Sequence, residues 1–235
     1  MTREWLEKGG LLVNSRLSGL GLRHGVTTRK LGNMKDQSRR RAAAATLGLL
    51  APLTLHQVHG TKIFRASPEN DGLDGDGWIL GPGDNGRSVG VYAADCVPLY
   101  LWSDDGSHAG VFHAGWRGTA SGMVKAAVAA FARLGVRSST LCAAAGPHIG
   151  ACCYKVGPEL EKAFPSISFV RRDGGLYLDL AVETRRQLLE SGLLSDRVVI
   201  DSPCTASHPE DYFSFRRDKQ DARMLALLSL DRWPS

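Results

Sequence analysis

Three apolar runs in the middle of the chain are separated by only a few polar residues. They cover residues 89–93, 97–102 and 109–112. Short runs rich in Val, Tyr and Phe predict buried strands. Asp95 and Cys96 separate the first two runs, and His113 follows the third. Because polar groups are costly to bury without a partner, a Cys and a His at neighbouring strand ends indicate a thiolate–imidazole pair or two metal ligands.

The rest of the chain alternates shorter strand patterns with helical ones. Further strands are predicted at 11–17, 26–28, 53–56, 61–66, 140–145, 176–180 and 198–201, and helices at 42–50, 119–134, 158–164, 181–191 and 220–230. Segments 29–41, 67–88 and 202–218 are polar or glycine-rich and predict loops. In the helix at 119–134, Val124, Val128 and Phe131 recur at helical period on one face.

Strand, helix and strand over residues 109–145 predict a crossover unit, so we expect part of the sheet to be parallel. No internal repeat and no break in composition marks a linker. We therefore predict an α/β (α+β) fold in one domain spanning residues 1–235.

Composition narrows the classes of function. Of the 235 residues, 43% are hydrophobic, which is enough for a sizeable core, and the formal net charge is +5. The only basic run is Arg39-Arg40-Arg41, which is more typical of a solvated helix flank than of a nucleic-acid grip, so we expect no nucleic-acid partner. The sequence contains no stretch of 18 apolar residues, so we expect no membrane-spanning helix. Five cysteines in an odd, scattered pattern do not predict a disulfide framework and favour a reducing cytoplasm.

His59, Cys96 and His113 are the leading candidates for chemistry. Two imidazoles and one thiolate are a common zinc set, with a fourth position left for water or substrate. From the residues alone, a buried structural Cys beside two ordinary histidines fits equally well. Two further alternatives are a Cys–His hydrolase, with Cys96 as nucleophile and His113 as base, and a module in which the metal is only structural.

Three loops are candidates for binding an anion. Residues 115–119 join a strand to a helix, where backbone N–H groups and Arg117 would suit phosphate. Residues 146–150 carry His148 in a glycine-rich turn, and residues 213–218 carry Arg216 with a second arginine. For each loop the alternative is an ordinary turn with surface ion pairs.

Five ordered motifs resemble one known family. They are His-Gln-Val-His-Gly at 56–60, Ala-Asp-Cys-Val-Pro at 94–98, His-Ala-Gly-Trp-Arg-Gly at 113–118, Gly-Pro-His-Ile-Gly-Ala-Cys-Cys-Tyr at 146–154 and Phe-Ser-Phe-Arg-Arg-Asp at 213–218. Together they are similar to the YfiH/DUF152 family of laccase-domain proteins, over about residues 25–224. The resemblance implies mixed sheets in a sandwich flanked by helices, related to bacterial toxin deamidases.

The resemblance also implies zinc at His59, Cys96 and His113. The implied reaction is phosphorolysis of adenosine, inosine, guanosine or methylthioadenosine, with adenosine deamination beside it. Editing of peptidoglycan precursors and copper-dependent phenol oxidation are also linked to the family. The oxidase label fits poorly, because multicopper oxidases use His-x-His pairs, and none occurs among the seven histidines here. Thiolate and imidazole can still hold copper in vitro.

Within this reading, we expect Arg117 with the amides of Gly118 and Thr119 to bind phosphate. Arg29 or Arg216 would supply a second cation, and His148 would protonate the purine. Residues 30–38 are shorter than the family's usual segment at this place, which walls the pocket, so the preferred nucleoside stays open. The sequence does not distinguish a monomer from a homodimer.

Overall fold

The apolar runs at the centre form strands whose two faces are both buried. In the computed structural model, which describes residues 4–232, these strands are β7 (Ser88–Ala93), β8 (Val97–Ser103) and β9 (Ala109–Ala114). Along β8, Leu99 and Leu101 face a core shared with helices, whereas Tyr100 and Trp102 face a core shared with a second sheet. The three predicted strands are confirmed, and their alternating side chains define the layers of the molecule.

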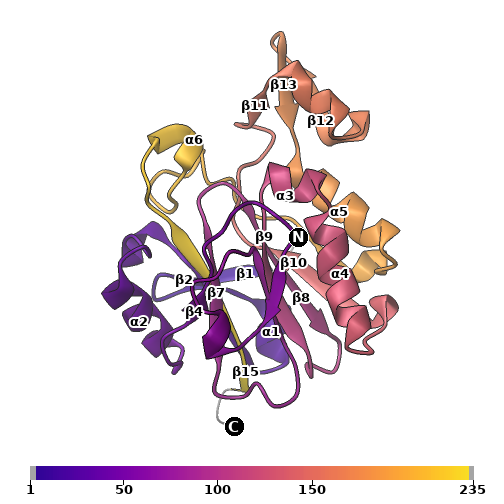
Figure 1. The fold of residues 1–235 in the computed structure, drawn as a ribbon. Helices are drawn as coiled ribbons and strands as arrows, with labels where there is room; N and C mark the ends of the chain where they lie inside the picture. Colours follow the sequence, from indigo (N-terminus) through magenta and orange to yellow (C-terminus); the bar gives the residue numbers. More distant parts are fainter. Residues whose placement is uncertain (1–3, 233–235) are drawn as a thin grey trace.

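Two six-stranded sheets pack on one another around the second of these cores (Figure 1). The first has the order β1 (Trp5–Lys8), β2 (Leu11–Asn14), β3 (Leu22–Thr27), β15 (Met224–Arg232), β7 and β4 (Leu53–Thr54). The second has the order β14 (Val198–Val199), β10 (Leu141–Ala145), β8, β9, β6 (Gly77–Leu80) and β5 (Ile63–Arg65). Parallel pairs occur at β4–β7, β5–β6 and β10–β14, and the other pairs in these sheets are antiparallel.

Helices cover the outer face of each sheet (Figure 1). Helix α2 (Gln37–Thr46) packs on the first sheet, and α3 (Trp116–Ala120), α4 (Met123–Arg133) and α5 (Leu180–Glu190) lie on the side of the second. The remaining α-helices and strands are α1 (Ser15–Gly19), α6 (Phe215–Asp218) and a small sheet of β11 (Lys155–Val156), β13 (Gly175–Leu178) and β12 (Phe169–Arg172). The predicted mixed α/β sandwich is therefore confirmed.

Several predicted boundaries need correction. The predicted helix at 119–134 is broken into α3 and α4 at Gly122, whose φ of 93° only glycine adopts readily. The loop predicted at 29–41 contains the start of α2, because Asp36 accepts hydrogen bonds from the N–H groups of Ser38 and Arg39 and caps it. The loop at 67–88 contains β6, and the helix at 158–164 is a 3₁₀ helix (Pro158–Lys162). In the predicted crossover unit at 109–145, β9 and β10 do run in the same direction. They are not paired with each other, because β8 lies between them and is antiparallel to both.

The predicted helix at 220–230 is wrong. Residues 224–232 form β15, the longest strand described, which lies between β3 and β7. Leu225 and Leu227 face α2, while Ala226 and Leu228 face the core between the sheets. Because both faces are buried, the segment has no polar alternation, and a continuous apolar run does not distinguish strand from helix.

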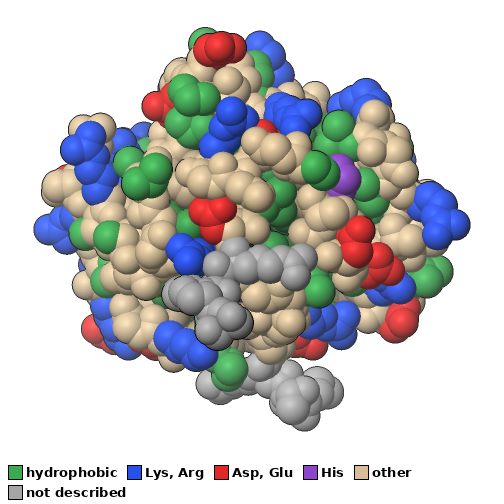
Figure 2. Space-filling view, turned by 90° about the horizontal axis from the view of Figure 1, so that it is seen from below, with side chains coloured by type: hydrophobic (Ala, Val, Ile, Leu, Met, Phe, Trp, Pro, Cys, Tyr) green, Lys and Arg blue, Asp and Glu red, His purple; other side chains and the backbone are tan. Residues whose placement is uncertain are grey.

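On the visible part of the face in Figure 2, Lys and Arg side chains are interspersed with Asp and Glu rather than gathered in one patch. Among residues 4–232, no helix has the length and apolar character needed to cross a bilayer.

Candidate functional site

His59, Cys96 and His113 meet at one end of the second sheet. His113 lies in β9 beside the start of β8, and Cys96 immediately precedes β8. His59 comes from the loop between β4 and β5 and has a left-handed φ of 60°. The ring centroids of His59 and His113 are 4.8 Å apart, and the candidate ligand atoms of all three residues lie within 4.8 Å of one another. These three side chains could hold a metal ion.

Asp76, which the sequence analysis did not single out, organises this cluster. Its buried carboxylate accepts hydrogen bonds from the backbone N–H groups of Val58 (3.3 Å), His59 (2.9 Å) and Gly60 (2.7 Å). The Nδ1–H of His113 donates to the same carboxylate at 2.8 Å. Asp76 therefore fixes the backbone at His59 and the tautomer of His113, and leaves Nε2 of His113 for Cys96.

The thiol and the imidazole change each other's charge. Burial acts to raise the pKa of Cys96, but the charge of His113 and hydrogen bonds from His113 and His59 outweigh it and lower the pKa to about 6. Burial acts to lower the pKa of His113, but Cys96 and the Asp76 carboxylate raise it to about 9. At neutral pH the metal-free pair is therefore a thiolate beside an imidazolium.

Two glycines of the motif at 113–118 are required by close packing. A Cβ at Gly115 would lie 2.8 Å from Sγ of Cys96 and 3.1 Å from Cδ2 of His59. A Cβ at Gly118 would lie 3.0 Å from the carbonyl oxygen of Gly60. Glycine at 115 lets the β9–α3 turn pass close to the cluster, and glycine at 118 lets α3 pack against the backbone of Gly60.

Arg117 and Arg216 come from two short helices, α3 and α6, and the charges of both act on Tyr154. Arg117 is exposed, with its guanidinium 4.5 Å from the ring centroid of Trp116. Arg216 is also exposed, lies 4.9 Å from the ring centroid of Tyr154, and donates from Nη1 to the carbonyl oxygen of Lys155 at 2.6 Å. Burial and the charge of Cys96 raise the pKa of Tyr154 to about 12, against the opposing charges of Arg216 and Arg117. Both guanidinium groups thus act on the surroundings of Cys96 and Tyr154.

Asp95 joins the loops around the cluster. Its left-handed φ of 99° turns the chain between β7 and β8. Its carboxylate accepts from Oγ1 of Thr205 and from the backbone N–H of Arg216, both at 2.6 Å. Its carbonyl oxygen accepts from the N–H of Ile149 at 2.9 Å. The buried polar residue noted between the strands therefore holds two loops beside Cys96.

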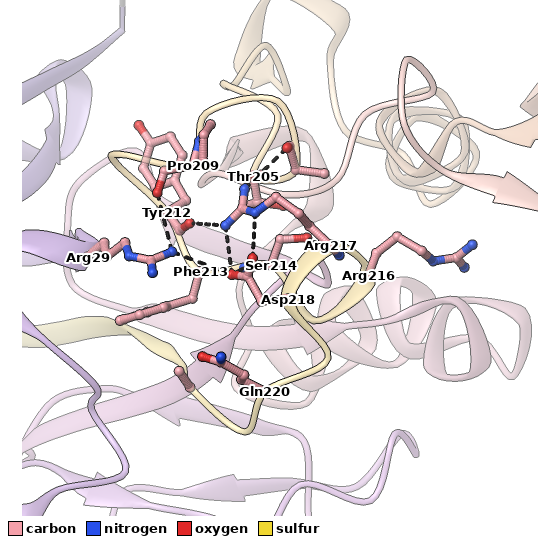
Figure 3. Close-up of polar contacts among 12 residues, drawn as sticks. Arg29, Thr205, Pro209, Tyr212, Phe213, Ser214, Arg216, Arg217, Asp218 and Gln220 are labelled. Atoms are coloured by element: carbon pink, nitrogen blue, oxygen red, sulfur yellow. Dashed lines mark hydrogen bonds and ion pairs between the residues drawn. The ribbon is translucent and has the colours of Figure 1, made fainter.

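Arg29 points elsewhere. Its guanidinium lies 5.0 Å from the ring centroid of Phe213 and 3.5 Å from a carboxylate oxygen of Asp218. In Figure 3, Arg216 extends away from Arg29 on the other side of the loop. Arg217, in the middle, pairs with Asp218 and donates to the carbonyl oxygens of Thr205, Ala206 and Tyr212. Arg29 and Arg217 hold this loop together, so the prediction of Arg29 as a second cation is not supported.

Two further predicted roles are corrected. Thr119 is fully buried and its N–H donates to the carbonyl oxygen of Gly115 at 2.8 Å, so this amide is not free for an anion. His148 is buried, and its Nδ1–H donates to the carbonyl oxygen of Gly146 at 2.9 Å. Burial lowers the pKa of His148, so the ring is neutral and its one proton is already engaged. His148 is not a proton donor in this arrangement.

The chain is similar to known proteins over most of its length. A family model described as "Multi-copper polyphenol oxidoreductase laccase" matches residues 24–231. A purine nucleoside phosphorylase of Deinococcus radiodurans is 31% identical over 241 residues, covering 92% of each chain. Adenosine deaminase RL5, from an unknown prokaryotic organism, is 34% identical over 140 residues, covering 56% of this chain and 53% of that protein.

A solved structure has the same fold over nearly the whole chain. YlmD from Geobacillus stearothermophilus superposes with a TM-score of 0.88 and 27% identity, covering 98% of this chain and 99% of the other. The resemblance predicted from the five motifs is therefore confirmed in both sequence and fold.

Proposed function

The chain belongs to the family described as "Multi-copper polyphenol oxidoreductase laccase", and we propose that it is a zinc-dependent purine nucleoside phosphorylase that also deaminates adenosine. The relatives named purine nucleoside phosphorylase and adenosine deaminase support this proposal. The observation that carries the proposal is the convergence of His59, Cys96 and His113, with Asp76 fixing two of them. Adenosine, inosine, guanosine and methylthioadenosine are the substrates proposed. The five free cysteines support a reducing compartment, the cytoplasm.

The donor set fits zinc. His59 and His113 offer imidazole nitrogens, Cys96 offers a low-pKa thiolate, and Asp76 supplies the carboxylate that commonly supports a zinc-bound histidine. When bound, zinc would supply Lewis-acid polarisation of a substrate group or water at the open fourth position. A multi-copper oxidase centre fits less well. Among residues 4–232, the candidate metal sets are this one and a group of three cysteines, so imidazole donors occur in one set only.

The surrounding residues suit phosphorolysis. Breaking an N-glycosidic bond develops positive charge on the sugar and negative charge on the purine, so phosphate must be held beside the sugar. Arg117, at the N-terminal turn of α3, is the proposed phosphate ligand together with the amide of Gly118, and Arg216 is the second cation. The pKa of Tyr154 is raised to about 12, so its hydroxyl is protonated at neutral pH. Tyr154 is therefore a neutral hydrogen-bond donor beside Arg216.

Product analysis tests the reaction. With zinc-loaded protein, adenosine should give adenine and ribose 1-phosphate only when phosphate is added. In the absence of phosphate, deamination should convert adenosine to inosine. A charge-assisted contact contributes roughly 1.5–3 kcal/mol, so Arg117→Ala should weaken phosphate use about 10- to 100-fold and affect deamination less. Arg133→Ala, at the exposed end of α4, is the matched control and should change neither activity. Absence of adenine at every phosphate concentration would contradict phosphorolysis.

One observation favours a second candidate, a Cys–His hydrolase or deamidase. Without metal, Cys96 is a thiolate beside the imidazolium of His113, which is the charge state of an activated nucleophile. In that case Cys96 would form a covalent adduct with substrate. Mass spectrometry of protein quenched during turnover distinguishes the two, because the zinc reading predicts no adduct on Cys96.

A further inference from the structure

A second group of sulfur atoms lies on separate segments of the chain. Cys152 and Cys153 lie in the turn that follows residues 146–150, and Cys204 lies in the segment after β14. Their three Sγ atoms are within 4.8 Å of one another. Cys152 is exposed and the other two are partly exposed, so an ion can reach the group from solvent. Nothing in the proposed reaction uses these thiols.

The backbone brings the two segments together. His148 and Cys204 form a β-bridge, and the N–H of Thr205 donates to the carbonyl oxygen of His148 at 3.0 Å. The N–H of Gly150 donates to Sγ of Cys204 at 3.2 Å, a hydrogen bond that favours the thiolate. A Cβ at Gly150 would lie 3.3 Å from Sγ of Cys152 and 3.8 Å from Sγ of Cys204. The arrangement of the three sulfurs is therefore set by ordered backbone.

We propose that Cys152, Cys153 and Cys204 form a second metal site that binds cuprous copper through three thiolates. Around an ion with metal–sulfur bonds of about 2.3 Å, three trigonal sulfurs would be about 4 Å apart, which the observed spacing reaches with small adjustments. The site goes beyond the proposed phosphorylase function and does not depend on it.

The donor set decides between copper and other metals. Within residues 4–232, no His, Asp or Glu belongs to this group, so all its donors are soft sulfurs. Structural zinc almost always takes four ligands, whereas soft thiolates select cuprous copper and do not suit magnesium or calcium.

Nearby cations offset the charge of three thiolates. Arg172 donates to the carbonyl oxygen of Cys152, and Arg217 donates to the carbonyl oxygens of Thr205 (2.9 Å) and Ala206 (3.2 Å). Three thiolates with one monovalent cation carry a net charge of −2. The two guanidinium groups, which are hydrogen-bonded to backbone carbonyl oxygens of the same two segments, carry the opposite charge. The electrostatic surroundings thus suit the anionic complex.

The test is an anaerobic titration of the reduced, metal-free protein with the acetonitrile complex of cuprous copper, in competition with bathocuproine disulfonate. It uses the Cys96→Ala variant, so that the first cluster does not contribute. We expect one tightly bound copper per chain and a new ultraviolet thiolate-to-copper absorption. Since even outer-shell partners contribute 10- to 100-fold to metal affinity, Cys152→Ser and Cys204→Ser should each weaken binding by more than about 100-fold. Cys142→Ser, on β10 and outside both groups, is the control and should leave binding unchanged.

Several results would overturn the proposal. One is failure of the Cys96→Ala protein to retain copper against the competitor. Another is equal binding by Cys204→Ser. Tighter binding of zinc than of cuprous copper at the three cysteines would reassign the metal. Circular dichroism checks that the variants fold, and Cys152→Ser is the decisive one because this exposed side chain is not part of the core.

Discussion

The two sulfur-containing groups of this protein are built on opposite principles. Cys96 is combined with His59 and His113, and Asp76 anchors the surroundings through four hydrogen bonds. The group at 152, 153 and 204 contains only sulfur donors and lies nearer to solvent. The first group is ordered by a buried carboxylate, whereas the second is ordered by a turn and a β-bridge.

The difference is visible in the ionisation of the thiols. Neighbouring imidazoles lower the pKa of Cys96 to about 6, whereas burial and the two neighbouring cysteines raise the pKa of Cys153 to about 12. An imidazolium stabilises a neighbouring thiolate before any metal binds, whereas one thiolate disfavours ionisation of a second thiol beside it. We therefore expect the first group to be preorganised and the second to need its ion to become fully ionised.

Removing Cys96 should have the largest effect on zinc content, because it should abolish zinc binding at the first group. Wild-type protein should carry about one zinc per chain, and Cys96→Ala should carry none, because two imidazoles are too few ligands. Phosphorolysis should fall below detection. Elemental analysis is the measurement, with Cys142→Ser as the control that keeps its zinc. Unchanged zinc in Cys96→Ala would remove this residue from the site.

Alkylation of the metal-free protein should compare the thiols directly. Below pH 6 Cys96 is protonated, so its reaction with iodoacetamide should rise through a midpoint near pH 6 and then level off. Lower intrinsic reactivity of a low-pKa thiolate offsets part of its advantage, so at pH 7 Cys96 should react on the order of 100-fold faster than Cys153. Peptide mapping gives both rates, and added zinc should protect Cys96. A midpoint near the ordinary thiol value of about 8.5 would show that His113 does not activate Cys96.

Replacing the carboxylate should test whether Asp76 is what distinguishes the first group. Asp76→Asn keeps the size of the side chain but loses the charge and at least one acceptor, so zinc affinity should fall about 10- to 100-fold. Asp84→Asn is a matched control. Asp84 is equally buried and accepts from Arg65, Arg87 and the N–H of Gly81, away from the cluster. Both variants should lose stability in urea, but only Asp76→Asn should lose zinc affinity.

A pair of glycine variants should give the smallest and most graded contrast. At Gly115, the added methyl would lie 2.8 Å from Sγ of Cys96, whereas at Gly150 no sulfur would be nearer than 3.3 Å. Gly115→Ala must displace the thiol and should weaken zinc binding by about tenfold, and Gly150→Ala should change copper binding only a few-fold. Competition titrations measure both. A larger loss at Gly150 would show that the second group is the more rigid one.

Much of this arrangement followed from the sequence. The three central strands, the helix at 181–191 and the cluster of His59, Cys96 and His113 are where their patterns placed them. Asp76 was missed because it lies in a long segment rich in glycine and acidic residues, where nothing local separates one carboxylate from its neighbours. Its role arises only when β6 brings it to His113, since the N–H of His113 donates to its carbonyl oxygen at 2.7 Å.

The errors also have physical causes. The amide of Thr119 was predicted to bind an anion because residues 115–119 join a strand to the start of a helix, but this amide already donates to the carbonyl oxygen of Gly115. Arg29 and Arg216 are equivalent in sequence terms, and only the folded loop separates a guanidinium held over Phe213 from one beside Tyr154. Side-chain direction in loops depends on tertiary contacts, which no local pattern encodes.

The position of β15 has a consequence for biosynthesis. This strand contains residues 224–232, yet it lies inside the first sheet, where it pairs with β3 on one side and β7 on the other. The other six-stranded sheet uses residues no later than 199 and can assemble earlier on the ribosome. Until residues 224–232 are available to pair, β3 and β7 each expose an unpaired edge beside an apolar core. A chain in which residues 224–232 have not yet been added should therefore be the state most prone to aggregation and most dependent on chaperones.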